Sequence, residues 1–422
     1  MAATSRSAWP VALAVTSLIQ IAVSFLSQAM SVLAPSLTLA AGVLPEQIGW
    51  LAGFVAFGTV WFLMGANNLL SDLGPVRLLQ LGVLLSACGL LLALIGFWPT
   101  TLVAALFVGL GYGPAPPAGN QILMDTAPKS HRGLIFSIKQ SGAPIGSALA
   151  GILLPFLADR YGWSTALAIA AGLAVAVAVS VEPFRFQLDA RKSRPSVASF
   201  GSLFSFHMLA APFEAMQRTR GLGLLAYAGF AFASVQGSLF ALYVTYLVTI
   251  IGTDLTFAGA AFAIMQLAGA IARIAIGWLA DRVRSPLLVT SALGVASSVV
   301  VTLISFMQLS WDWNVILSIS ALAGFCAASW NGVLMSEIAK SSPSQQVGQT
   351  TSAATFFIFI GYVFGPICFA TIIRCTGSYS FGFSFLEFFP ITGSVALYLL
   401  SRRGINREEW PCPEPQLSSA DK

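Results

Sequence analysis

Two positively charged side chains lie inside long apolar stretches of this sequence. Lys139 stands seven residues beyond Arg132, and Arg273 stands eight residues before Asp281. At a helical rise of about 1.5 Å per residue, each charge lies about 10–12 Å from that polar end of its stretch. A charge inside a membrane-spanning helix is costly unless it is paired, and it marks a functional site by default. Both residues are therefore candidates for binding an anion. The alternative is that Lys139 snorkels to the membrane surface and that Arg273 bonds helix carbonyls or Asp281.

Uncharged polar side chains recur at helical spacing in several other apolar stretches. Glutamine and asparagine both donate and accept hydrogen bonds, so they can orient a bound polar molecule. A single amide of this kind more often bonds a neighbouring helix than a ligand. Gln28 and Gln236, which occupy matching places in the two halves of the chain, are the best candidates for ligands. The polar faces comprise Ser24, Gln28, Ser31 and Pro35, then Gln236, Tyr243 and Tyr246, with Asn120 and Asn331 in two further stretches.

The residues that would serve enzymatic or metal chemistry are scarce. The five cysteines show no C-x-x-C spacing, which disfavours a disulfide framework or a zinc site. The only two histidines, His131 and His207, lie in basic connecting segments. No nucleophile–base pair stands out. We expect no enzyme activity, no catalytic residue, no metal site and no cofactor.

The composition is that of a membrane protein with many spans. Of the 422 residues 57% are hydrophobic and 9% are charged, whereas soluble domains carry about 25% charged residues. Stretches long enough to span a bilayer occur twelve times. They cover 11–37, 48–70, 76–97, 101–124, 134–157, 163–182, 222–250, 256–280, 286–308, 314–338, 347–373 and 379–401. The first lacks a signal-peptide cleavage site and is expected to be a retained helix.

Basic residues predict the orientation of these spans. Both tails and the even-numbered connections hold 17 of the 21 Lys and Arg residues, whereas the odd-numbered connections hold only Arg160 and Arg374. The positive-inside rule then places both termini in the cytoplasm, with the protein in the inner (plasma) membrane. The net charge of +5 follows from this bias and gives no sign of nucleic-acid binding. The expected divisions are a first bundle at 1–182, a cytoplasmic connector at 183–221, a second bundle at 222–401 and a cytoplasmic tail at 402–422.

Two features of the chain bear on how the halves are related. Within the connector, Phe200, Leu203, Phe204 and Met208 suit a short amphipathic surface helix, with an irregular linker as the equal alternative. Residues also match between the halves at offsets that rise slowly along the chain. Gln28 pairs with Gln236 at 208 and Asp72 with Asp281 at 209, whereas Gly146 and Gly361 differ by 215. The halves thus read as parallel six-helix repeats, an arrangement that secondary transporters use around a midplane site.

The segment Gly277–Arg282 reads Gly-Trp-Leu-Ala-Asp-Arg at the end of the eighth span. It resembles the loop motif of the major facilitator superfamily, and the copy after the second span keeps Asp72, Gly74 and Arg77 but has Asn68 in place of glycine. The resemblance covers residues 10–400. It implies an all-α membrane fold of two six-helix bundles related by a pseudo-two-fold axis. It also implies a gate on the cytoplasmic side, formed by Asp72, Arg77, Gly277, Asp281, Arg282, Asp125 and Glu337.

Glycine and proline in the fifth and eleventh spans resemble a second motif of the family. Small residues four apart let helices pack closely, and proline allows a local bend. The helix-packing residues expected from this partial match are Gly142, Pro144, Gly146, Gly361, Gly365 and Pro366. The fourth span departs from the family, because no basic residue occurs between Arg77 and Lys129, where many proton-coupled members carry an arginine.

These observations lead to an expected function. The resemblance places the fifth and eighth spans at the interface of the halves, so Lys139 and Arg273 are expected to face one cavity. Two cations with no obvious acidic partner favour an anionic ligand. An arginine followed by a glycine four residues later also resembles the carboxylate-transporting branches of the family.

We therefore expect a monomeric secondary transporter of a small organic anion, working by alternating access, with a proton as candidate co-substrate. Arg273, Lys139, Gln28, Gln236, Asn120 and Asn331 are the expected binding residues. The alternative is an exporter of hydrophobic drugs or metabolites in which Arg273 is structural.

Overall fold

The computed structural model describes residues 8–65, 73–128, 131–189, 213, 221–342 and 347–402. These residues form helices and no strand, and twelve helical segments are long and apolar enough to cross a membrane. The first six spans are α1 (Trp9–Val32) with α2 (Ala34–Ala40), η1 (Pro45–Gln47) with α3 (Ile48–Gly65), α5 (Pro75–Ala93), α6 (Trp98–Tyr112) with α7 (Ala115–Thr126), α8 (Arg132–Tyr161) and α9 (Trp163–Val181). The short elements η3 (Glu182–Phe184) and α10 (Arg185–Leu188) follow α9.

The second six spans repeat this plan. They are α12 (Leu222–Tyr246) continued by the π-helix η6 (Leu247–Ile251), α13 (Leu255–Val283), α14 (Pro286–Ser305), α15 (Trp313–Ala327) with α16 (Asn331–Lys340), α17 (Val347–Thr376) and α18 (Tyr379–Arg402). The expectation of twelve spans is confirmed, with ends that shift by a few residues. The expected connector helix at Phe200–Met208 lies outside the described residues.

Local sequence explains where the helices begin and end. Proline, which lacks an N–H and has a fixed φ, occupies the first turn of α1, α5, α6 and α14. Asp254 caps α13 by accepting a hydrogen bond from the N–H of Phe257 at 2.8 Å. Gly162 joins α8 to α9 with φ of 83°, a left-handed conformation that L side chains rarely adopt. The prolines, the capping aspartate and the glycine at the helix ends are thus consistent with the observed helix boundaries.

Two spans are broken, which the sequence analysis did not foresee. The fourth span is interrupted at Gly113–Pro114, between α6 and α7, and the tenth at residues 328–330, between α15 and α16. Proline explains the first break, because Pro114 has no N–H to continue the helical ladder. At the second break the buried indole of Trp330 donates to Gln236 Oε1 at 3.0 Å. Each break leaves backbone carbonyls without helical partners near the middle of its bundle.

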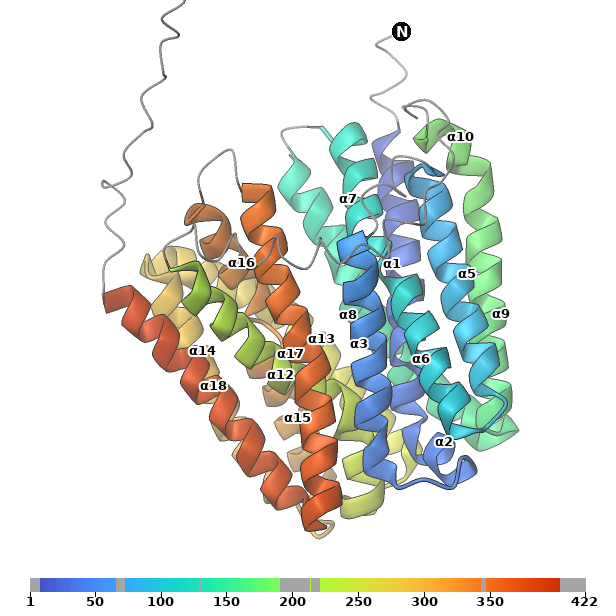
Figure 1. The fold of residues 1–422 in the computed structure, drawn as a ribbon, viewed down its shortest axis with the longest axis vertical. Coiled ribbons are helices and arrows are strands. Elements are labelled where there is room, and N and C mark those ends of the chain that lie inside the picture. Colours follow the sequence, from blue (N-terminus) through green and yellow to red (C-terminus); the bar gives the residue numbers. More distant parts are fainter. Residues whose placement is uncertain are drawn as a thin grey trace, which may run out of the picture.

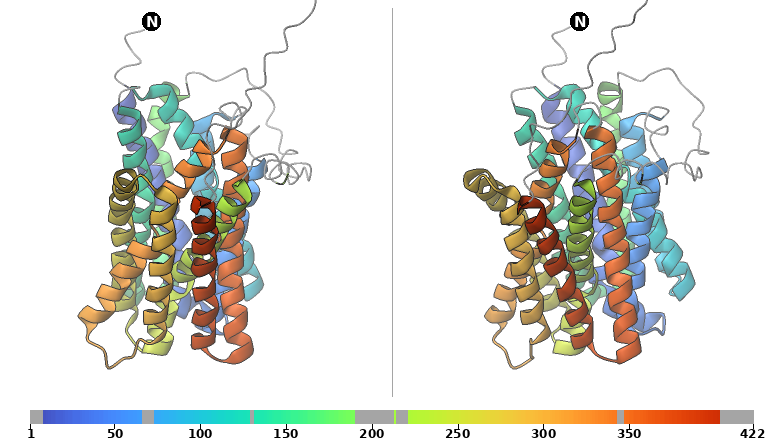
Figure 2. Two further views of the ribbon diagram at one scale, coloured as in Figure 1. Left: turned by 90° about the vertical axis from the view of Figure 1, so that its left-hand side faces the viewer. Right: turned by 60° about the vertical axis from the view of Figure 1, so that its left-hand side comes forward.

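The two halves pack as separate helix bundles that meet along a seam (Figures 1 and 2). Helix α3 lies beside α17, and α8 lies beside α13. We call the face where α1 begins and α10 ends the terminal face (upper edge of Figure 1). The opposite face is the one where α8 joins α9.

The seam is tightest toward the opposite face and is formed by glycines. A Cβ atom at Gly49 would collide with the carbonyl of Pro366, and one at Gly259 would collide with the carbonyl of Gly151. Among the residues whose side chains the structure describes, no hydrogen bond or ion pair joins the two halves. Backbone-to-backbone packing of small residues therefore holds this face closed.

The predicted helix-packing glycines lie at crowded helix crossings within each half. Cβ atoms at Gly146, Gly361 and Gly365 would overlap backbone atoms of Ile21, Phe230 and Ser234, respectively. Gly142 lies against Gln20, with 3.1 Å from its hypothetical Cβ to that side chain. The prolines Pro144 and Pro366 are inside α8 and α17, where each removes one backbone hydrogen bond.

Candidate functional site

A cavity of about 630 Å³ lies between the two halves. Helices α1, α3, α6, α7 and α8 contribute its wall on one side, and α12, α13, α16 and α17 contribute the other. Its volume lies within the usual range of small-molecule sites. The wall combines amide and hydroxyl side chains with the aromatic rings of Tyr112, Phe240, Phe359 and Tyr362.

Arg273 is the charged residue of this wall. It extends from α13, is partly exposed to the cavity, and donates from Nε to the carbonyl oxygen of Ala328 at 3.0 Å. That carbonyl belongs to the break between α15 and α16. Within the described part of the chain Arg273 forms no ion pair. The Nε bond holds the guanidinium in place, and its two Nη groups remain available to a ligand.

Lys139 occupies a different place from Arg273. Its side chain is 1% exposed, and the cavity wall does not include it. Its Nζ donates to the carbonyl of Ala115 at 3.3 Å and to Asn120 Oδ1 at 3.5 Å. Asn120 itself lines the cavity, as does Asn331 on the other side. The two cations therefore do not share one surface, because Asn120 stands between Lys139 and the cavity.

The predicted glutamines Gln28 and Gln236 both line the cavity. Gln236 Oε1 accepts two hydrogen bonds, one from Trp330 Nε1 and one from the hydroxyl of Tyr362, each at 3.0 Å. The carbonyl side of this amide is thereby saturated, and its N–H₂ group is the side that can serve a ligand. Gln28 Oε1 is buried and has no hydrogen-bond partner.

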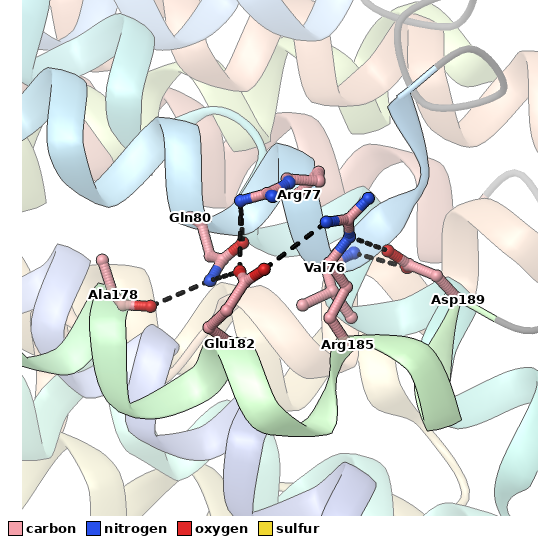
Figure 3. A network of polar contacts seen from close by, with 7 residues as sticks. All are labelled: Val76, Arg77, Gln80, Ala178, Glu182, Arg185 and Asp189. Carbon is pink, nitrogen blue, oxygen red and sulfur yellow. Dashed lines mark hydrogen bonds and ion pairs between the residues drawn. The ribbon is translucent and has the colours of Figure 1, made fainter.

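The gating residues of the first half form a network that stays within that half (Figure 3). Asp72 lies outside the described residues. Arg77 pairs with Glu182 at 3.1 Å, and Gln80 bonds both Glu182 and the carbonyl of Ala178 at 2.9 Å. The carboxylate of Asp189 accepts from the backbone N–H of Val76 at 2.9 Å. These bonds fasten the start of α5 to the segment after α9.

The corresponding loop of the second half has no such network among the described residues. Asp281 is exposed and makes no resolved bond, Gly277 has open space around it, and Arg282 lies 5.5 Å above the ring of Trp278. Glu337 pairs with Lys340 at 2.8 Å on its own helix. Asp125 is exposed and has a partner of its own. In the part of the chain that the structure describes, none of these side chains forms a hydrogen bond or ion pair with a described residue of the other half.

The sequence analysis missed several polar residues of the cavity, among them Gln266, Tyr112 and Tyr362. Gln266 is 2% exposed, and its Nε2 atom has no partner. A signal was present, because Gln266 precedes Arg273 by seven residues and so falls on the same helical face. Among the described residues no group of three or more His, Cys, Asp or Glu residues is placed to hold a metal ion.

Two bundles of membrane-length helices with a polar cavity between them are the arrangement that secondary transporters use. The chain belongs to the Major Facilitator Superfamily, whose sequence pattern matches residues 16–366. The expected family and fold class are thereby confirmed.

Similar proteins include named transporters. A probable 4-methylmuconolactone transporter of Cupriavidus pinatubonensis is 29% identical over 190 residues, which cover 43% of this chain and 44% of that protein. A gallate transporter of Pseudomonas putida is 26% identical over 253 residues, covering 53% and 54%. The chain thus spans about half the length of these two relatives.

A solved structure shows the same fold. The bacterial homologue of the human lysosomal transporter Spinster, crystallised in an inward-facing and unoccupied conformation, superimposes with a TM-score of 0.74 at 15% identity. The superposition covers 94% of this chain and 98% of that one.

Proposed function

We propose that the protein is a secondary active transporter of a small organic anion, with a carboxylate bound by Arg273. The observation that carries the proposal is the state of this guanidinium. Its Nε is held by the Ala328 carbonyl, it faces the cavity, and no acidic side chain in the described residues neutralises it. A guanidinium so placed offers a two-pronged donor to a carboxylate, and the bound anion would remove the cost of the unpaired charge.

The name of one relative supports this substrate class. Gallate is an aromatic carboxylate, and the relative from Pseudomonas putida is named for its transport. The aromatic rings of the cavity would pack against an organic skeleton while Arg273 holds its charge.

We further propose alternating access between the two faces of the membrane. The glycine seam closes the opposite face, and cavity residues such as Gln140, Asn331 and Met335 extend toward the terminal face. By the positive-inside rule we propose that the terminal face is cytoplasmic. We propose the inner membrane as the location of the protein. The monomer is the proposed transporting unit, with a proton as the proposed coupling ion.

The test is uptake into proteoliposomes from a panel of aromatic and aliphatic carboxylates and lipophilic cations. We expect carboxylate uptake, and we expect Arg273→Gln to reduce it about 10- to 100-fold, since a charged hydrogen-bond partner contributes about 1.5–3 kcal/mol. Arg374→Gln is the control, because it removes an exposed arginine from the last turn of α17, outside the cavity and the expected gate, and is expected to leave uptake intact.

Equal carboxylate uptake by Arg273→Gln and the parent protein would overturn the proposal. Transport of lipophilic cations with no transport of acids would also contradict it, and would support an exporter of hydrophobic compounds instead.

A further inference from the structure

Two buried amide atoms without partners lie at the deep end of the cavity. Gln266 Nε2 on α13 and Gln28 Oε1 on α1 are both inaccessible, and neither has a hydrogen-bond partner. Gln266 is 2% exposed, and both residues belong to the cavity wall. They come from different halves of the protein, so a ligand touching both would bridge the halves.

These atoms differ from the other unpaired groups of the described residues. The remaining buried side-chain atoms without a partner are all hydroxyl oxygens, and none of them is on the cavity wall. An unmade hydrogen bond at a buried amide costs about 1–3 kcal/mol, and native interiors leave few such groups unpaired. A ligand in the cavity could supply the missing partners.

The depth of the two amides along their helices is nearly equal. Gln266 is 11 residues from the start of α13, about 16 Å, and Gln28 is 12 residues from the end of α2, about 18 Å. Arg273 is two turns further along α13, about 10 Å from Gln266, on the same face. The side chains of Gln266 and Arg273 both tilt toward the start of α13.

Aromatic side chains lie between these two levels. Tyr112 is 14 residues from the start of α6 and Tyr362 is 14 residues from the end of α17, which places each about 21 Å from the opposite face. Arg273 lies about 27 Å from it by the same measure. The two tyrosines thus lie between the level of the two unpaired amides and the level of Arg273.

We propose that Gln28 and Gln266 form a second binding subsite, which receives a hydroxyl group at the far end of an aromatic carboxylate held by Arg273. This inference rests on the proposed function. After two hydrogen bonds of about 2.8 Å each, about 5 Å of the separation remain for the ligand. One benzene ring with substituents at opposite ends fills that length.

The pair of amide atoms selects a hydroxyl over other oxygen groups. Gln266 Nε2 requires an acceptor and Gln28 Oε1 requires a donor. A hydroxyl is both at once, whereas an ether or ketone oxygen only accepts. Turning both amides over exchanges the two roles and leaves the same match.

The experiment measures competition by benzoate, 4-hydroxybenzoate and 4-methoxybenzoate for uptake into proteoliposomes. We expect the parent protein to prefer 4-hydroxybenzoate over the other two about 10-fold or more, since each unpaired buried partner costs about 1–3 kcal/mol. Gln266→Leu and Gln28→Leu should each abolish the preference for 4-hydroxybenzoate over the other two benzoates. Gln140→Leu, which changes a glutamine at the other end of the cavity, should keep the preference.

Several results would overturn the subsite. One is a parent protein that takes up all three benzoates equally, a comparison that needs no variant to fold. Another is an unchanged preference in Gln266→Leu, or in Gln266→Asn should the leucine variant fail to fold. A parent that transports other carboxylates through Arg273 but no benzoate also contradicts the subsite and leaves the proposed function standing. Loss of all dependence on Arg273 would instead refute the proposed function.

Discussion

Lys139 and Arg273 lie in α8 and α13, which pack against each other at the seam, yet the two cations have different surroundings. Each donates to a backbone carbonyl beside the break of a span, Lys139 to Ala115 at 3.3 Å and Arg273 to Ala328 at 3.0 Å. Lys139 is buried behind Asn120, whereas Arg273 is open to the cavity. Equal depth in the membrane and the same type of partner thus lead to different environments.

The chemistry of the two side chains explains the difference. A guanidinium carries five donors in a rigid fork, so Arg273 can satisfy Ala328 through Nε and still present its Nη groups. An ammonium is a compact point charge, and Lys139 directs it at two neutral oxygens inside one bundle. We infer that the lysine ties α8 to α7 and that the arginine binds the ligand.

Exchanging the type of cation at the cavity tests this comparison most strongly. Arg273→Lys keeps the charge, but one ammonium cannot both hold Ala328 and bind a carboxylate in two-pronged fashion. We expect the half-saturating carboxylate concentration to rise about 10-fold, because about one charged hydrogen bond is lost. Concentration series of uptake measure this effect. Lys139→Arg is the matched exchange in the other half, and a larger rise there than at Arg273 would reverse the assignment.

Removing the buried cation should affect stability more than binding. Lys139→Met leaves Ala115 and Asn120 without their donor, and we expect a loss of about 1–3 kcal/mol in the free energy of unfolding. Denaturant unfolding in detergent is the measurement. Uptake per folded molecule should stay within about 3-fold of the parent, the change that about 0.6 kcal/mol produces. A drop as large as that of Arg273→Gln would show that Lys139 also serves the ligand.

The smallest effect is expected at Asn120, which separates Lys139 from the cavity. Asn120→Ala removes one of two acceptors and should cost about 0.5–1.5 kcal/mol of stability. Carboxylate affinity should not change measurably in the same protein. Asn331→Ala, the corresponding change in the second half, is the control. A selective loss of affinity in Asn120→Ala would identify this residue as a ligand of the substrate.

Much of the fold could be predicted because membrane spans have a strong and local signal. About 20 apolar residues in a row identify each helix without knowledge of its neighbours. The site was harder to predict, since spacing along a helix gives depth and leaves direction open. For that reason the depth of Lys139 was foreseen and its place behind Asn120 was not. Gln266 carried the helical spacing to Arg273, but an isolated glutamine is ambiguous until its missing partner is seen.

Partners far apart in the sequence were likewise beyond prediction. Arg77 was assigned to a gate, and its bond to Glu182 joins residues 105 positions apart within one bundle. The two broken spans also differ in how they could be foreseen. Pro114 marks the first break, whereas the second, at residues 328–330, contains no proline and depends on the tertiary contact of Trp330 with Gln236.

The glycine seam between Gly151 and Gly259 has a consequence for the energy of the transport cycle. Its described contacts are packing contacts between small residues, so separating the halves there leaves no polar group in search of a partner within the membrane. Such a closure can open without breaking hydrogen bonds or ion pairs between the described residues of the two halves. The two end states can then differ by only a few kcal/mol, which is the range that binding of one small anion can shift.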